Sequence, residues 1–277
     1  MPDKPHVDWE PSRESVLRGI DTTIPNPARV YDYLLGGKDN FEVDRATAEA
    51  GIGAFPKIVQ SARANRVFLG RVVRFLAQSG IRQFLDIGTG LPSLNNVHEV
   101  AQSVAPESKI VYVDNDPVVL LHAEVLLAST PEGTTKFIEA DMREPEKIVA
   151  QAGEWLDFGQ PVAVQLFGIL HFLADDEEAA HIVRTLMDAV PAGSYLAICH
   201  LTADIYPELG ELARRVNERQ RNAPLVLRDH AQVTGLFDGL DLVPPGVVQA
   251  SKWRPDSELE AAAPAALWAG VARKGQA

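Results

Sequence analysis

The sequence has little cysteine and few basic residues. Its 277 residues include one cysteine, Cys199, which excludes an internal disulfide and a thiolate metal cluster. Lysine and arginine together number 26 against 38 acids, which gives a formal charge of -12. This balance argues against a broad basic surface for nucleic acid or an anionic membrane, although a local basic patch stays open. We therefore expect a small-molecule partner, with no nucleic acid and no membrane.

Long apolar runs are also missing. No stretch approaches the about 18 consecutive apolar residues of a membrane span, and residues 1–10 lack the apolar core of a signal peptide. The seven histidines are scattered and form no convincing metal triad. We therefore expect a cytoplasmic protein that holds no metal. The sequence leaves the oligomeric state open.

What is present is the composition of a soluble globular protein, with 46% hydrophobic and 23% charged residues. At roughly 150 residues per domain, the length fits one large domain or one domain with an appendage. Residues 1–14 are polar and rich in proline. We predict an N-terminal tail and cap or lid over residues 1–59, followed by a cofactor-binding domain over residues 60–277.

A glycine-rich turn follows a short apolar run in residues 84–92, FLDIGTGLP. This pattern predicts a buried strand that runs into a loop lying close to a ligand. Asp86 stands before Gly88 and Gly90, where a carboxylate would repel a pyrophosphate but suits a cationic amine. S-adenosylmethionine, with its ammonium and sulfonium, is such a ligand. A nicotinamide site is disfavoured by Asp86 and by Ser93, which occupies the third glycine position of that motif.

Two more predicted strands end in an acid. Asp114 ends the strand 109–114, where a carboxylate can accept hydrogen bonds from both ribose hydroxyls. Asp141 follows the strand 135–139 and could accept from the adenine amine, with Met142 against the base. Each acid alone has a plainer interpretation as a turn residue. Their recurrence at successive strand ends favours a ligand site, because open α/β sheets bind ligands there.

Strands and helices alternate along the chain, which predicts an α/β protein whose sheet is mostly parallel with an antiparallel edge strand. The expected strands are residues 82–87, 109–114, 135–139, 161–172, 194–201 and 266–273, and the expected helices are residues 61–79, 97–104, 117–129, 175–190 and 206–221.

The strand predicted over residues 161–172 leads toward the reacting centre. Its Phe167-Gly168 exit is expected under the amino-acid end of the cofactor. His171 is equally well explained as a general base or as a loop or packing residue. If a base is needed, His171 is the first candidate and Tyr31 the second.

Residues 21–45 crowd polar, aromatic and turn residues together. Pro27 is expected to open a short helix that the Gly36-Gly37 pair ends. The segment is either a surface helix at the domain edge or a lid that forms a substrate wall. The candidate lid and substrate residues are Arg29, Tyr31, Tyr33, Lys38 and Asp39.

The order of Asp86-x-Gly88-x-Gly90, Asp114 and Asp141-Met142 resembles the class I S-adenosylmethionine-dependent methyltransferases. Residues 26–40, the loop at 86–92 and residues 253–256 also resemble the actinobacterial S-adenosyl methyltransferase family first catalogued as a domain of unknown function. This resemblance spans almost the whole chain. It implies a Rossmann-like, seven-stranded methyltransferase sheet with an N-terminal helical cap over the cofactor cleft, and it implies no substrate.

The expected function is methyl transfer from S-adenosylmethionine to a small-molecule acceptor, with S-adenosylhomocysteine as product. Residues 167–171 lack the Asp/Asn-Pro-Pro-aromatic segment of many nitrogen methyltransferases, which makes DNA or protein amines less favoured acceptors. The alternatives are a non-catalytic module that binds the cofactor and, more remotely, a nicotinamide oxidoreductase. The expected cofactor-binding residues are Asp86, Gly88, Thr89, Gly90, Asp114, Asn115, Asp141, Met142, Phe167 and Gly168, with Arg63 or Arg66 on the cofactor carboxylate.

Overall fold

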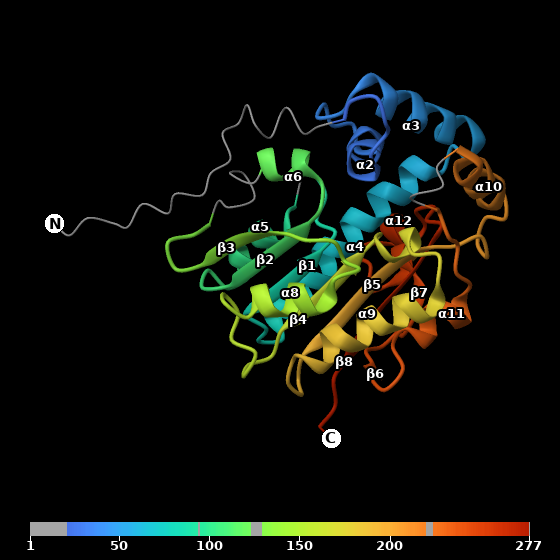
Figure 1. The fold of residues 1–277 in the computed structure, drawn as a ribbon. Helices are drawn as coiled ribbons and strands as arrows, with labels where there is room; N and C mark the ends of the chain where they lie inside the picture. Colours follow the sequence, from blue (N-terminus) through green and yellow to red (C-terminus); the bar gives the residue numbers. More distant parts are fainter. Residues whose placement is uncertain (1–20, 94, 123–128, 220–223, 277) are drawn as a thin grey trace.

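A single mixed sheet organises the molecule (Figure 1). This computed structural model describes residues 21–276 except 94, 123–128 and 220–223. The strand order is β3-β2-β1-β4-β5-β8-β6, and a further short strand, β7, pairs with β8. The strands are β1 Gln83–Ile87, β2 Lys109–Asp114, β3 Thr134–Glu139, β4 Ala163–Phe167, β5 Tyr195–Leu201, β6 Asp241–Leu242, β7 Val248–Gln249 and β8 Leu267–Arg273.

The sheet topology confirms the predicted fold class. Strands β1 to β5 run parallel, whereas β8 is antiparallel to β5, β6 and β7. The chain leaves β1 toward β2 on one side and later returns to β4 on the other, so the strand order reverses between β1 and β4. Such a reversal opens a crevice at the carboxyl ends of the strands. The prediction of seven strands holds along the main path, and β7 is an additional two-residue strand.

One predicted strand is too long. The apolar run over residues 161–172 forms β4 only as far as Phe167, and residues Leu170–Phe172 form the 3-10 helix η1. Gly168 takes φ +71°, a left-handed conformation that breaks the strand. Since a continuous apolar run fits a buried strand and a buried turn equally well, hydrophobicity alone misplaced this boundary.

Two layers of helices cover the faces of the sheet (Figure 1). Helices α4 (Ile58–Gln78) and α5 (Val97–Val104) pack on one face, and α8 (Pro145–Ala152), α9 (Asp176–Asp188) and α11 (His230–Gly235) pack on the other. The predicted helix at 117–129 is described as α6 (Pro117–Leu121), because residues 123–128 lie outside the described part. Helix α10 (Leu209–Arg219) begins three residues later than predicted.

The N-terminal cap consists of α2 (Pro27–Leu35) and α3 (Glu42–Ala54), as Figure 1 shows. Pro27 opens α2 and Gly36 ends it with φ 87°, as predicted. A buried ion pair joins the two helices, with Arg29 Nε 3.2 Å from Asp44 Oδ2. Asp44 also accepts hydrogen bonds from the backbone N–H of residues 26 and 41. The cap is therefore fixed by buried polar contacts as well as by packing.

Residues 253–256, which contribute to the family resemblance, pack against helix α4 through Trp253. The Trp253 side chain is fully buried, and its ring meets Phe68 of α4 edge-on. The Arg71 guanidinium, also on α4, donates to the carbonyl oxygens of Trp253 (2.9 Å) and Ala250 (2.6 Å) and pairs with Glu260 of helix α12 (Glu258–Ala261). These contacts hold the segment 250–260, including the 3-10 helix η2 (Ala250–Lys252), against α4. No helix in the described part is long and apolar enough to cross a membrane.

Candidate active site

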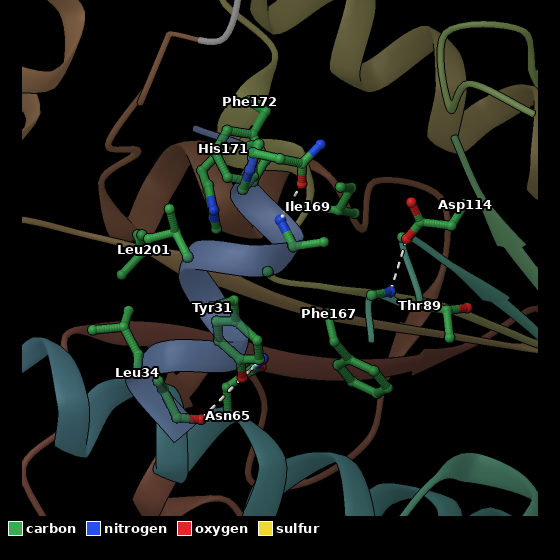
Figure 2. A pocket seen from close by; sticks show the side chains of 18 of the residues that line it. Tyr31, Leu34, Asn65, Thr89, Asp114, Phe167, Ile169, His171, Phe172 and Leu201 are labelled. Carbon is green, nitrogen blue, oxygen red and sulfur yellow. Dashed lines mark hydrogen bonds between the residues drawn. The ribbon is translucent and has the colours of Figure 1, made fainter. Parts of the chain in front are cut away.

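A cavity of about 510 Å³ lies where the sheet, the cap and α10 meet. Its wall comes from the carboxyl ends of the parallel strands and from α2, α3, α4 and α10. The volume is typical of small-molecule sites, which range over roughly 300–1,000 Å³. Figure 2 shows the cavity with Asp114 and Thr89 on one side, Leu34 and Leu201 on the other, and Tyr31 between them.

The glycine loop after β1 has the backbone that the sequence predicts. Gly88 and Gly90 have φ +73° and φ +67°, in the left-handed region. A Cβ at Gly88 would stand 2.6 Å from Ile169 Cγ1, so a side chain there would displace the neighbouring loop. The loop is fixed by the Thr89 hydroxyl, which donates to the Asp86 carbonyl oxygen at 3.0 Å. Both glycines and Thr89 line the cavity.

Asp114 closes the adjacent strand and lines the same wall. Its Oδ2 accepts from the backbone N–H of Gly90 at 2.7 Å, and its Oδ1 accepts from the N–H of Asp116 at 3.0 Å. Burial raises the pKa of Asp114 to about 6 despite these hydrogen bonds. Asp116 in turn accepts from Val118 N–H at 2.8 Å at the start of α6. Asp114 thus links the glycine loop to the start of α6 and still borders the cavity.

Asp86 lies deeper, near the end of β1, and only 5% of it is exposed. Burial raises its pKa to about 7, opposed by the positive charge of Arg66. The strand register places Tyr112 of β2 and Gln165 of β4 on either side of Asp86. In the ligand-free protein, the surroundings of Asp86 therefore supply too little positive charge and too few hydrogen bonds to offset the burial of its ionised form.

The end of β3 adds a polar cluster. Asn115 Nδ2 donates to Asp141 Oδ2 at 2.9 Å, and the N–H of Arg143 donates to Asp141 Oδ1 at 2.9 Å. Met142 is 7% exposed and lines the cavity beside them. Sequence reasoning missed Arg143, which also lines the cavity and donates through its guanidinium to the Phe172 carbonyl oxygen at 3.1 Å. Arg143 therefore ties the β3 exit to η1.

Tyr31 and Asn65 form a hydrogen-bonded pair across the cavity floor (Figure 2). The Tyr31 hydroxyl donates to the Ala62 carbonyl oxygen at 3.0 Å, because a carbonyl can only accept. Asn65 must then donate through Nδ2 to the Tyr31 oxygen, at 3.0 Å, which leaves Asn65 Oδ1 without a hydrogen-bond partner in the described chain. Burial raises the pKa of Tyr31 to about 12. Asn65 was not among the predicted site residues.

His171 on η1 faces the cavity and is 6% exposed. Its Nδ1 is buried without a hydrogen-bond partner among the described residues. Burial lowers its pKa well below the usual value, and the neighbouring His200 and Arg228 add to this effect. The imidazole is therefore neutral at physiological pH.

A buried arginine organises the residues behind His171. Arg228 is 1% exposed and pairs with Asp176, and its Nη1 donates to the Leu170 carbonyl oxygen at 2.9 Å. The same Nη1 contacts His200 Nε2 at 2.9 Å. Since arginine only donates, His200 accepts at Nε2 and carries its proton on Nδ1. An isolated arginine in a loop gives no sequence signal for this role.

The structure brings most of the predicted site residues together and leaves five outside the cavity lining. Tyr31, Arg66, Phe167, Gly168 and His171 join the acids and glycines around the cavity. Those outside the lining are Arg29, Tyr33, Lys38, Asp39 and Arg63.

Helical phase explains most of the outlying positions. Tyr31 and Leu34 of α2 face the cavity, whereas Arg29 turns into the ion pair with Asp44 and the Tyr33 hydroxyl bonds to Glu49 of α3. Arg63 is exposed because it lies two residues from the buried Ser61 and Asn65 on α4. Lys38 is exposed, and Asp39 pairs with His122 at 3.3 Å. Among the described residues no group of three or more histidine, cysteine or acidic side chains is placed to hold a metal ion.

The sheet order, the glycine turn and the successive acidic strand ends define a protein with the methyltransferase fold. The same fold occurs in magnesium protoporphyrin IX methyltransferase from Synechocystis, solved with bound S-adenosylhomocysteine, which is 12% identical with a TM-score of 0.52. The alignment covers 89% of this chain and 93% of that one.

Residues 13–275 match the family model described as S-adenosyl methyltransferase, and the chain belongs to this family. A protein of the family of unknown function DUF574 from Streptomyces avermitilis is 46% identical, with a TM-score of 0.88 and coverage of 92% of this chain and 99% of that one. A candidate methyltransferase from Thermobifida fusca is 42% identical, with a TM-score of 0.86 and coverage of 93% and 98%. No curated protein matches. The chain is therefore an S-adenosylmethionine-dependent methyltransferase, as the sequence predicted.

Proposed function

We propose that the cavity holds S-adenosylmethionine along the ends of β1 to β4 and a small-molecule acceptor against the cap and α10. One observation carries this proposal: the acids and glycines of the strand ends share a single cavity with a second wall on which the described residues place no charged side chain. Asp114 would bind the ribose, Asp141 and Met142 the adenine, and Asp86 with the glycine loop the methionyl part. Arg66, which lines the cavity, would approach the carboxylate.

The residues fit this cofactor chemically. Asp86 and Asp114 are buried carboxylates whose pKa values are raised to about 7 and about 6, so a bound ammonium and ribose would supply missing charge and hydrogen bonds. Gly88 leaves no room for a side chain beside Ile169, so the loop backbone itself forms the wall. S-adenosylmethionine supplies an electrophilic methyl group on sulfur.

The chain then has to position the acceptor, exclude water and remove a proton. His171 lines the cavity and is neutral, and its Nδ1 has no hydrogen-bond partner among the described residues, so it is the first candidate to accept that proton. The Tyr31 hydroxyl is a poor base, because it donates its proton to the Ala62 carbonyl oxygen. Its pKa, raised to about 12, keeps the hydroxyl protonated at neutral pH. The order of the two candidates is the one predicted from sequence.

A labelling experiment tests the acceptor class. The protein is incubated with methyl-labelled S-adenosylmethionine and an actinobacterial extract divided into small-molecule and macromolecular fractions. We expect label in the small-molecule fraction, with a loss of about 10²–10⁴-fold in rate for His171→Gln if it is the base. Label confined to protein or nucleic acid would refute the proposal. Tight cofactor binding without any transfer would instead favour a binding module.

A further inference from the structure

The charged side chains of the cavity are gathered on one wall. They belong to α4, to the ends of β1 and β2, and to the loops that follow β2 and β3. This wall also contains the glycine loop, so all of the charge lies where the cofactor is proposed to bind. The charged lining residues are Arg66, Asp86, Asp114, Asp116, Asp141 and Arg143.

The opposite wall is built from other elements. Helices α2, α3 and α10 and the end of β5 contribute aliphatic side chains, and no charged side chain lines this wall in the part of the chain that the structure describes. Figure 2 shows Leu34 and Leu201 across the cavity from Asp114 and Thr89. The main apolar lining residues are Leu34, Ala48, Leu201, Leu212, Val216 and Leu225.

Two side chains that line the same cavity, Asn65 and His171, carry buried polar atoms with acceptor capacity. Asn65 Oδ1 has no hydrogen-bond partner among the residues that the structure describes, and its assignment as the oxygen follows from the Tyr31 hydrogen bond. His171 is neutral and therefore keeps one acceptor nitrogen, and its Nδ1 has no hydrogen-bond partner in the described part of the chain. The two side chains flank Gly168: a Cβ there would lie 3.3 Å from Asn65 Nδ2 and 3.7 Å from His171 Cε1. Buried acceptors without partners favour a ligand group that donates a hydrogen bond.

We propose that the methyl acceptor is an uncharged, mainly apolar molecule whose polar end is a hydrogen-bond donor, such as a hydroxyl on a ring system. The apolar body lies against α2, α3 and α10, and the donor end lies at Asn65 and His171. An ionised acceptor would lose its water against this wall without gaining an opposite charge from the described residues that form it, so the apolar wall disfavours such an acceptor. This inference rests on the proposed placement of the cofactor along the strand ends.

Matched probes test the charge requirement. Equilibrium dialysis with the full chain saturated with S-adenosylhomocysteine compares 2-naphthol with 6-hydroxy-2-naphthoate, which has the same rings and hydroxyl plus a carboxylate. We expect 2-naphthol to bind at least about tenfold more tightly, since the carboxylate must be desolvated without a partner. Equal or tighter binding of the carboxylate, or no binding of 2-naphthol, overturns the inference.

Substitution of Val216 shows whether the apolar wall is responsible. Val216 is half-buried on α10 and is remote in sequence from the cofactor loops. Val216→Lys should reduce the preference for 2-naphthol over the carboxylate by about fivefold or more, because the ammonium supplies the missing charge. Val216→Met is the matched control and should keep the wild-type preference. An unchanged preference in a folded Val216→Lys protein contradicts the assignment of this wall.

The donor end has its own test. Asn65→Leu should lower the affinity ratio of 2-naphthol to 2-methylnaphthalene by about fivefold, since an acceptor for the hydroxyl is removed. An unchanged ratio contradicts the proposed donor end. Binding of S-adenosylhomocysteine is measured first in each protein. Failure of wild-type protein to bind it refutes the proposed function, whereas cofactor binding together with a preference for the charged probe refutes only the acceptor class.

Discussion

Asp114 has a structural role in addition to the binding role that we propose for it. Its carboxylate already receives two backbone hydrogen bonds, from Gly90 and Asp116. It is nevertheless part of the cavity wall, and burial raises its pKa. Removing the carboxylate should therefore change the glycine loop slightly and weaken ligand binding more strongly.

We predict that Asp114→Ala weakens binding of S-adenosylmethionine by about 1–3 kcal/mol, because charged hydrogen bonds to the ribose are lost. Calorimetric titration measures the change. Asp238→Ala, at an exposed position outside the cavity lining, is the control and should bind like wild type. Unchanged affinity in a folded Asp114→Ala protein would remove this residue from the cofactor site.

Asp86 makes stability depend on pH. Its folded pKa of about 7 lies above the ordinary value of 3.8, so the folded state retains a proton that the unfolded chain has released. Stability of the ligand-free protein should therefore fall as pH rises from about 4 to about 7. Asp86→Asn removes this dependence, and we expect it to raise the unfolding free energy by about 1–3 kcal/mol at about pH 8 and by little at about pH 4.

The same substitution should weaken binding of the cofactor ammonium, because an amide carries no negative charge. Denaturant melts with and without S-adenosylmethionine measure both effects. A variant that is less stable than wild type at every pH would show that Asp86 is ionised and compensated in the folded protein.

Sequence reasoning worked best where a residue type and its place in a strand coincide. Asp86, Asp114 and Asp141 were predicted in the cavity because parallel strands bring their carboxyl ends together. Asn65 was missed, because its importance depends on which hydrogen bond Tyr31 makes, and no local pattern encodes that. Arg29 looked like a binding residue but meets a buried acid from the next helix. A sequence shows the charge of a side chain but not its distant partner.

At the scale of the helices, a buried ion pair helps to fix α2 against α3 in the cap. Arg29 and Asp44 have side-chain exposures of 4% and 0%, so losing one charge leaves the other uncompensated. We predict that Arg29→Met destabilises the protein by about 3–5 kcal/mol or detaches the cap. Thermal unfolding and limited proteolysis after α3 would report these two outcomes.

A surface pair provides the matched control. Arg74 and Asp256 have side-chain exposures of 47% and 66%, and Arg74→Met should cost at most about 1 kcal/mol. The double change Arg29→Met with Asp44→Leu should recover part of the lost stability, because no buried charge remains. Equal effects of the two single Arg→Met changes would contradict a special role for the cap pair.

The turn after β4 is a second element on which the site depends. Gly168 has φ +71°, and an added Cβ would be 3.3 Å from Asn65 Nδ2. We expect Gly168→Ala to lose about 1–2 kcal/mol of stability from the left-handed backbone and to weaken ligand binding by displacing Asn65. Gly239→Ala is the control, since Gly239 has φ +80° and no described residue lies within 4 Å of the added Cβ. If both variants bind ligand normally, the spacing at Gly168 is not critical.

This turn also shows that an apolar run does not locate the end of a strand. The strand interiors and most helices were predicted from periodicity and from glycine or proline at their ends. The end of β4 was misplaced because residues 169–173, apart from His171, remain apolar after the strand has ended, and Leu170 and Leu173 are buried in the core without belonging to the strand. Element type follows local pattern, whereas this boundary follows tertiary burial.

For the whole molecule, the cavity joins parts of the chain that are distant in sequence. The cap, the sheet and α10 all contribute to its wall, so ligand binding should stabilise them together. At about 100 times its dissociation constant, S-adenosylhomocysteine should add about 2.7 kcal/mol of stability. Thermal unfolding would show this as a higher midpoint, and hydrogen exchange should slow at the glycine loop and in α2. Protection limited to the glycine loop would mean that the cap does not respond to the cofactor.

The division of the cavity into two walls has a consequence for how such an enzyme can change. The proposed cofactor wall is formed by strand ends that the fold itself holds in register, whereas the opposite wall is formed by α2, α3 and α10 at the periphery. Mutations in these peripheral helices can alter the shape of the acceptor chamber while the strand ends stay intact. Selection, or an engineer grafting these helices from one family member to another, can therefore vary the acceptor and keep the methyl donor constant.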